Sequence, residues 1–367
     1  MHRVRLASLI ALAAAALPCA LAAQGGVLVQ GIVDAEAWKT DTGSTLLTRN
    51  GGDPGGVLRL DLWAAAEPWR RVVFYAQGEG VTGALDRTGT RTQVDLDQAG
   101  VRVSLAPAFV LDAGKLPQVV GTFAGRRFST RNPLIGVPDG YPMQYPVVVK
   151  ASGSTVHWDY RAALVSLPVS HPGYTPTPSA SYRPAFGAGF TPVVGVRVGG
   201  SVTWGPYLNR NIPAAELAGE RWQHYQERII AADAHVSYGY LQAYAEYARS
   251  RYDVPGSADA VQGTTYYVEG AYALTPRWFV AARGERNDYP FIRPVGGSAW
   301  VARPTDFSDT EAGVGYRISA ATIAKLSYRW DHWQVTPANY AFVRPGGGAL
   351  ALQLSQAFDL TDWLQQL

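Results

Sequence analysis

Three arginines gather in a stretch of the sequence that has neither the period of a helix nor that of a strand. This stretch, residues 117–146, and the position shortly before it hold four cations and one acid: Lys115, Arg126, Arg127, Arg131 and Asp139. Cations in a constriction with low-dielectric walls raise the local concentration of anions. On an outer surface the same side chains would be solvated or paired with lipid phosphates. The sequence leaves both interpretations open.

Residues that could catalyse a reaction are present but scattered. The histidines after residue 100 are His157, His171, His224, His235 and His332. No G-x-S-x-G or H-E-x-x-H motif accompanies them. Asp233 and His235 would share one face of a strand and could begin a proton relay, although such a pair is more often plain polar lining. We therefore expect no enzyme activity.

The first 23 residues predict a secretory signal peptide. Arg3 and Arg5 precede an apolar run that ends in small residues of the A-x-A type. A membrane-anchoring helix is the alternative, but the run is short, rich in alanine and interrupted by Pro18. Cleavage would remove Cys19, the only cysteine, and leave residues 24–367 without disulfides or cysteine metal sites. We expect no metal and no cofactor.

The composition is typical of a transmembrane barrel. The chain is 47% hydrophobic with a mean hydropathy of -0.06, and no apolar run after the signal is long enough for a membrane helix. Alternating lipid-facing and lumen-facing positions average to such a neutral value. The formal net charge is only +3, which gives no reason to expect a nucleic-acid partner.

A hairpin in residues 227–253 shows the pattern that recurs along the chain. Apolar and polar residues alternate with period two on both sides of Gly239, which permits a tight turn. One face would be apolar and the other wet. A soluble all-β domain could contain the same hairpin, so the number of copies and their connections decide between the two classes.

The pattern predicts about sixteen strands. They fall near residues 27–38, 58–64, 71–79, 92–105, 108–116, 147–152, 156–167, 185–191, 196–204, 227–238, 241–253, 264–274, 277–287, 307–317, 322–333 and 348–360. A change of phase within the fourth predicts a β-bulge near Asp97. Tight turns alternate with long loops, one of which would hold a short helix from Pro213. That sorting is expected of short periplasmic turns and long outer loops, not of a soluble sandwich.

These features resemble a known group of membrane proteins. The strand plan, the irregular segment after the fifth strand, the letters GPYL at residues 205–208 and the hairpin SYGYLQAYAEYARSRYDVP are similar to those of bacterial outer-membrane porins of the phosphate-selective O and P type. Such barrels usually end in an aromatic residue, whereas this chain ends TDWLQQL. Phe358 is the candidate for that residue, followed by a short tail.

The resemblance implies a pore whose lining can be named from the alternation. The inward positions carry both signs: Arg59, Asp61, Arg71, Glu79, Arg197, Asp233, His235, Glu246, Glu269, Arg283, Glu285, Glu311, Lys325, Arg329 and Asp331. In porins such groups form facing acidic and basic walls. We expect the 117–146 segment to fold inward as the constriction, because a loop of this length without its own elements is uncommon.

We therefore expect an all-β transmembrane antiparallel barrel in residues 24–367, which acts as a porin for small hydrophilic solutes with a weak anion preference. Its partners would be outer-membrane lipid, lipopolysaccharide and the solutes, and the resemblance implies a homotrimer. The alternatives are a plugged transporter like those for long-chain fatty acids and, less favoured, a barrel enzyme. The absence of an N-terminal plug argues for an open pore.

Overall fold

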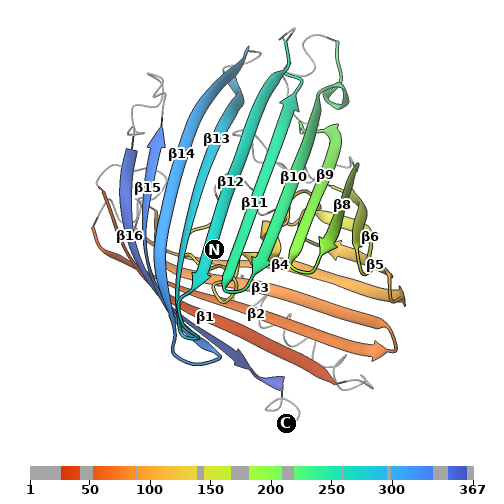
Figure 1. The fold of residues 1–367 in the computed structure, drawn as a ribbon. Helices are drawn as coiled ribbons and strands as arrows, with labels where there is room; N and C mark the ends of the chain where they lie inside the picture. The colour runs from red at the N-terminus through yellow and green to blue at the C-terminus, as the bar shows by residue number, and fades with distance from the viewer. Residues whose placement is uncertain are drawn as a thin grey trace.

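Sixteen antiparallel strands close into one barrel (Figure 1). The computed structural model describes residues 26–41, 53–86, 89–138, 144–166, 182–208, 219–255, 257, 259–295, 299–333 and 346–361. Each strand pairs with its neighbours in the sequence, and the first pairs with the last, so that Gln30 lies opposite Asp359 and Thr40 opposite Ala349. The predicted barrel is confirmed, including its strand number.

The strands occupy most of the described chain. Their bounds are β1 Val27–Thr40, β2 Gly55–Trp69, β3 Val72–Asp86, β4 Gly89–Ala106, β5 Phe109–Lys115, β6 Val147–Ser154, β7 Trp158–Val165, β8 Arg183–Val193, β9 Val196–Pro206, β10 Gln226–Tyr238, β11 Leu241–Tyr252, β12 Val261–Ala273, β13 Trp278–Val295, β14 Ala299–Arg317, β15 Thr322–Trp333 and β16 Gly346–Asp359. Two short 3-10 helices are η2 Phe123–Arg126 and η4 Trp222–His224. Among the described residues, no helix is long and apolar enough to cross a membrane.

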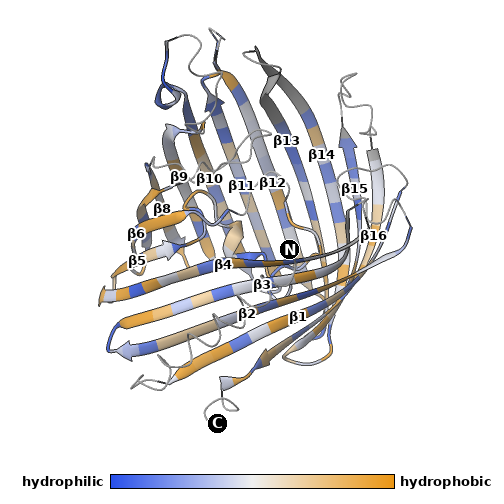
Figure 2. Cartoon of the chain, turned by 180° about the vertical axis from the view of Figure 1, so that it is seen from behind, coloured by the Kyte–Doolittle hydropathy of each residue, from blue (hydrophilic) through white to orange (hydrophobic). Residues whose placement is uncertain are grey.

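Hydrophilic and hydrophobic residues alternate along many of the strands (Figure 2). On β10, Ile230 points outward with 67% of its surface exposed, whereas Asp233, three residues further along and on the opposite face, is buried. Strand side chains alternate between faces, so an apolar outer surface and a polar interior follow from the period of two. Lipid would cover the outer face.

Local features of the wall agree with the sequence pattern. The β3–β4 register jumps from Gln77 opposite Gln98 to Gly78 opposite Leu96, which leaves Asp97 as the extra residue of the predicted bulge. Gly239 has a φ of 57°, a left-handed conformation that suits glycine in a tight turn.

One predicted strand end needs correction, and several predictions for the ends and loops fall on residues that the structure does not describe. The second strand does not end near residue 64, because β2 continues to Trp69, and Arg71 takes the left-handed conformation in the turn that follows, with a φ of 73°. The predicted signal peptide, the helix at Pro213 and the tail after Thr361 lie outside the described residues. Phe358 lies on β16 against Gly31 of β1.

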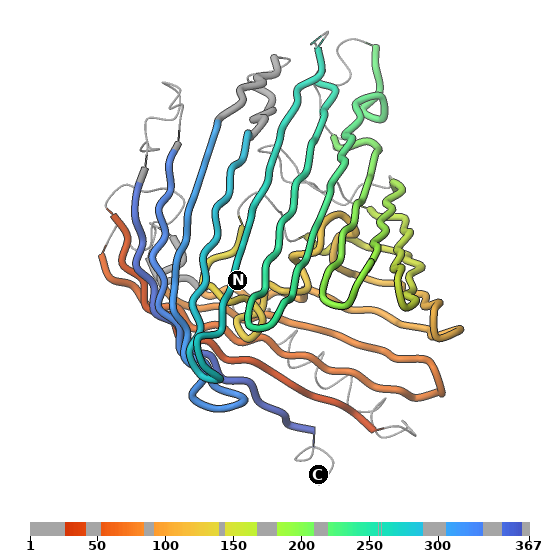
Figure 3. The backbone as a smooth tube through the Cα atoms, in the orientation of Figure 1, coloured from red at the N-terminus to blue at the C-terminus, as the bar shows by residue number. Residues whose placement is uncertain are grey.

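The segment after β5 folds into the barrel, as predicted. We call residues 117–138 the inner loop; its stretch of the tube lies within the space that the strands enclose (Figure 3). Val120 and Phe123 pack in a buried cluster with Ile229 of β10 and Tyr267 of β12. Ile135 packs in a different cluster, with Trp38 and other residues of the opposite wall. The inner loop therefore spans the lumen.

Candidate functional site

Arg127 anchors the inner loop to a wall of carboxylates. Its guanidinium donates to Glu79 at 3.1 Å and also to Asp97, and it lies 3.6 Å from Asp61. The bulge supplies Asp97, so a local irregularity of β4 completes the cluster. The ring of Tyr145 lies beside the same guanidinium, with 5.3 Å between the ring centre and Arg127 Cζ. Burial raises the pKa of the Tyr145 hydroxyl, which keeps this group neutral.

Within the described ranges, the same carboxylates are the best candidates for a metal site. Oxygens of Asp61, Glu79 and Asp97 lie within 4.8 Å of one another. Hard cations such as Ca²⁺ take carboxylate ligands of this kind. Here the guanidinium of Arg127 already lies among them and compensates part of their charge. The cluster is therefore an anchor for the inner loop.

Arg126 binds the wall across the lumen from these strands. Its guanidinium donates to Glu269 at 2.6 Å and to the Tyr267 hydroxyl at 2.9 Å. It also lies over the ring of Tyr244, 3.6 Å from the ring centre. Neighbouring arginines in the sequence thus reach different walls, because Arg126 closes a 3-10 turn and Arg127 follows it.

Two further wall carboxylates accept hydrogen bonds from the backbone of the inner loop. Glu246 accepts from the amide and the hydroxyl of Thr122 at 2.9 and 2.7 Å. Glu311 accepts from the amides of Ile135 and Gly136 at 3.1 and 3.0 Å. Backbone amides that leave water need such partners. These carboxylates hold the loop as acceptors for its buried donors.

Lys325 serves the carbonyl groups of the same loop. Its ammonium donates to the carbonyl oxygens of Ser129, Asn132 and Leu134 at 2.5, 2.7 and 3.2 Å. The Ser129 hydroxyl in turn donates to Asp34 of β1 at 2.6 Å. An ammonium has three donors, and all three have acceptors here. Lys325 therefore fixes the fold of the loop.

On the β7 to β10 side, the wall presents a row of partly exposed charges. Arg161 donates to the carbonyls of Val119 and Gly121 at 2.8 and 3.3 Å. Arg197 donates to Asp159 at 2.6 and 2.8 Å and also to Asp233. The side chain of Arg197 keeps 21% of its surface exposed. This side of the lumen contains charged groups that water reaches.

Most of the remaining predicted site residues lie on the wall in ion pairs or other polar contacts, and two do not. Arg283 joins Glu269 and Glu311, and Arg329 lies 3.7 Å from Glu285. Arg59 lies opposite Asp34, and Asp331 is buried on β15, while His235 stacks on Tyr244 with ring centres 4.3 Å apart. Lys115 donates to the Leu96 carbonyl. The prediction that Arg71 lines the lumen is wrong, because β2 ends at Trp69 and Arg71 lies exposed in the following turn, where it donates to the Leu105 carbonyl. Asp139 lies outside the described residues.

Sequence reasoning missed several residues that hold the loop. They are Asp34, Thr122, Ser129, Asn132 and Gly136. Asp34 sits at an inward position of β1, so the alternation could have found it. The loop residues carry no periodic signal, and only the folded path brings them to the wall.

Between the inner loop and the tight turns there is a cavity of about 480 Å³. Its lining comes from the loop, from the β10–β11 turn and from the ends of β11 to β15. Among the described residues that line it are four cations: Arg126, Arg131, Arg317 and Lys325. None of these described lining residues carries a carboxylate. Tight turns mark the periplasmic end of such barrels, so the cavity lies on that side of the loop.

Solved structures share this architecture although their sequences differ. No family model and no curated protein matches the sequence. The anion-selective porin from Comamonas acidovorans has a TM-score of 0.59 at 10% identity, over 91% of this chain and 99% of its own. OmpF of Salmonella typhi, in complex with daunomycin, has 0.59 at 13% identity, over 91% and 98%. The chain therefore shares the fold of these outer-membrane proteins, a closed antiparallel barrel.

A third similar structure is the outer-membrane protein OmpT of Vibrio cholerae without its loop L8. Its TM-score is 0.58 at 12% identity, over 91% of this chain and 99% of its own. At these identities the likeness concerns the fold alone.

Proposed function

We propose that the protein is a porin that lets small hydrophilic solutes diffuse across the outer membrane, with the inner loop as its constriction. One observation carries the proposal: a closed barrel holds a loop inside its lumen by ion pairs and hydrogen bonds to walls on both sides. A loop fixed in this way forms a permanent constriction and not a moving gate. The narrowest point of the pore then determines the flux of solutes.

A weak anion preference belongs to the proposal. Arg126 and Arg127 are compensated by wall carboxylates, so they contribute little net charge. Arg131 is exposed, and the only hydrogen bond described for its side chain goes to the Gly125 carbonyl at 3.2 Å. Together with the cationic cavity below the loop, this residue favours anions at the periplasmic end.

Single-channel recording in a planar bilayer tests the proposal. A gradient of potassium chloride across the bilayer gives the reversal potential, which measures the preference between chloride and potassium. We expect steady conductance and a reversal potential on the chloride side. The Arg131→Gln variant should shift it toward zero, whereas Arg277→Gln, at an exposed turn outside the cavity, should not.

A plugged, ligand-specific transporter is the second candidate, because the inner loop contacts many strands. Its anchors include β1, β3, β12, β14 and β15. A folded barrel that shows no conductance in the bilayer would favour this candidate and reject the open porin.

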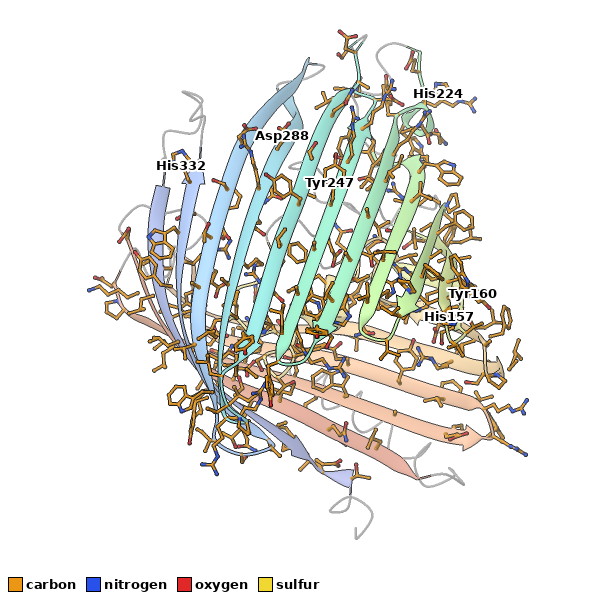
Figure 4. The ribbon with its side chains drawn as sticks, viewed as in Figure 1. His157, Tyr160, His224, Tyr247, Asp288 and His332 are labelled. Atoms are coloured by element: carbon orange, nitrogen blue, oxygen red, sulfur yellow. The ribbon has the colours of Figure 1, made fainter. Side chains whose placement is uncertain are left out.

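The proposed function involves lipid, lipopolysaccharide and solutes as partners, and no catalysis. His157, His224 and His332 lie far apart on the barrel (Figure 4), and His235 stacks against Tyr244. We also propose a homotrimer, since one of the similar structures is described as a trimer form of OmpT.

A further inference from the structure

The cavity below the inner loop has the size and the chemistry of a ligand site. Sites for small molecules have volumes of roughly 300 to 1,000 Å³, and this cavity has about 480 Å³. It is reached from the end of the barrel that bears the tight turns, where Gly239 and Tyr240 form part of its lining.

Two of its four cations remain open to a ligand. Lys325 already donates to three carbonyls, and Arg126 is paired with Glu269. Arg131 and Arg317 are both exposed, and no carboxylate in the described part of the chain forms an ion pair with either of them. A carboxylate between two guanidinium groups gains charge-assisted hydrogen bonds.

The rest of the lining combines polar side chains, such as those of Asn132 and Gln242, with an apolar part. The guanidinium of Arg317 lies over the ring of Phe279, with 4.7 Å to the ring centre, which fixes one face of the cation and leaves the other open. Ile323 and Ala271 add aliphatic surface to the same cavity. A bare inorganic anion would use the arginines but not this surface.

We propose that the cavity binds small organic carboxylates that carry an apolar body, with Arg131 and Arg317 on the carboxylate and Ile323 beside the body. The biological meaning rests on the proposed porin function, in which this site would retain such solutes at the periplasmic exit. The binding itself does not require conduction. It can therefore be measured separately.

Isothermal titration calorimetry of the folded barrel in detergent, with benzoate as the probe, tests the site. We expect one benzoate per barrel, and tighter binding of benzoate than of acetate, phosphate or neutral benzamide. Arg131→Gln and Arg317→Gln should each weaken benzoate binding about tenfold, as expected for the loss of a charge-assisted contact. Arg277→Gln, at an exposed turn on the same end, is the matched control.

A second variant examines the apolar part of the site. Ile323→Asn should weaken benzoate binding several-fold and leave acetate binding unchanged, because only benzoate reaches the aliphatic surface. Equal affinity for benzoate and phosphate, benzoate binding unchanged in the arginine variants, or no benzoate binding by a folded barrel would each overturn the proposal. A barrel that conducts but does not bind benzoate retains the porin function; one that binds but does not conduct loses it.

Discussion

At Gly136 the backbone of the inner loop lies so close to charged groups of the wall that no room is left for a side chain. A Cβ atom built on it would lie 2.5 Å from Glu311 Oε2 and 3.2 Å from nitrogens of Arg283 and Arg329. We expect Gly136→Ala to destabilise the loop by about 1–3 kcal/mol, as for other overpacked sites. Single-channel recording should then show conductance steps that the wild type lacks.

Gly125 offers the control for this substitution. It belongs to the same loop, yet a Cβ atom there would meet nothing within 4 Å. Gly125→Ala should therefore leave the conductance steady. Similar noise in both variants would show that the fit of Gly136 against Glu311 does not hold the loop.

Substitution of Lys325 tests whether the inner loop depends on the ammonium group that donates to its carbonyl oxygens. Lys325→Met keeps much of the side-chain volume but removes the donor from three buried carbonyls, which costs about 1–3 kcal/mol per unsatisfied group. We expect a lower thermal unfolding temperature and a noisier or larger conductance. Lys150→Met is the control, because the ammonium of Lys150 on β6 lies 3.4 Å from Asp112 on the neighbouring β5 and this ion pair does not involve the inner loop. Equal effects of the two variants would contradict the special role of Lys325.

At the residue scale, the alternation of the strands located inward charges but not their partners. Glu269 and Lys325 were predicted to line the lumen because period two assigns each side chain a face. That Glu269 binds Arg126, or that Lys325 binds backbone carbonyls, depends on the path of a loop without a period. The predicted anion preference therefore rested on Arg126 and Arg127 as well as Arg131. Because Arg126 and Arg127 form ion pairs with the wall, only Arg131 of the three still supports that preference.

At the element scale, the inner loop is held by the wall, while the wall is held by its own ladder of hydrogen bonds. The sixteen strands pair with one another without the loop, and β1 pairs with β16 along its length. Strands were predictable because each repeats one pattern, and the bulge at Asp97 because it breaks the pattern. The inward path of the loop was an inference from its length.

Deletion of the loop should therefore spare the barrel and widen the pore. We expect a chain with residues 119–136 replaced by a short Gly-Ser linker to fold, since no strand loses its neighbour. Its conductance should rise several-fold, because the narrowest point dominates the resistance of a pore. Circular dichroism would confirm the β content. Unchanged conductance of a folded deletion variant would place the constriction elsewhere.

At the scale of the whole molecule, the wall is uneven in height. Strands β5, β6 and β7 have 7, 8 and 8 residues, whereas β14 has 19. A strand that crosses the bilayer needs about 9–11 residues, so this side is too low to face lipid over its full depth. Its outer face is nevertheless apolar, with Val149 and Leu164 more than half exposed. Another protein surface is the natural cover for such a wall.

We therefore predict that the proposed trimer forms through the β5–β7 wall. Residues 24–367 contain no cysteine, so Val149→Cys and Val268→Cys each introduce a unique thiol for a fluorescent label. Both positions point outward with similar exposure, 57% and 59%, but Val268 lies on the longer β12. Nitroxide lipids should quench the label at Val268 strongly and the label at Val149 weakly. Because the two sites differ chiefly in their wall, equal quenching would mean that lipid covers β5–β7 and that the barrels do not associate there.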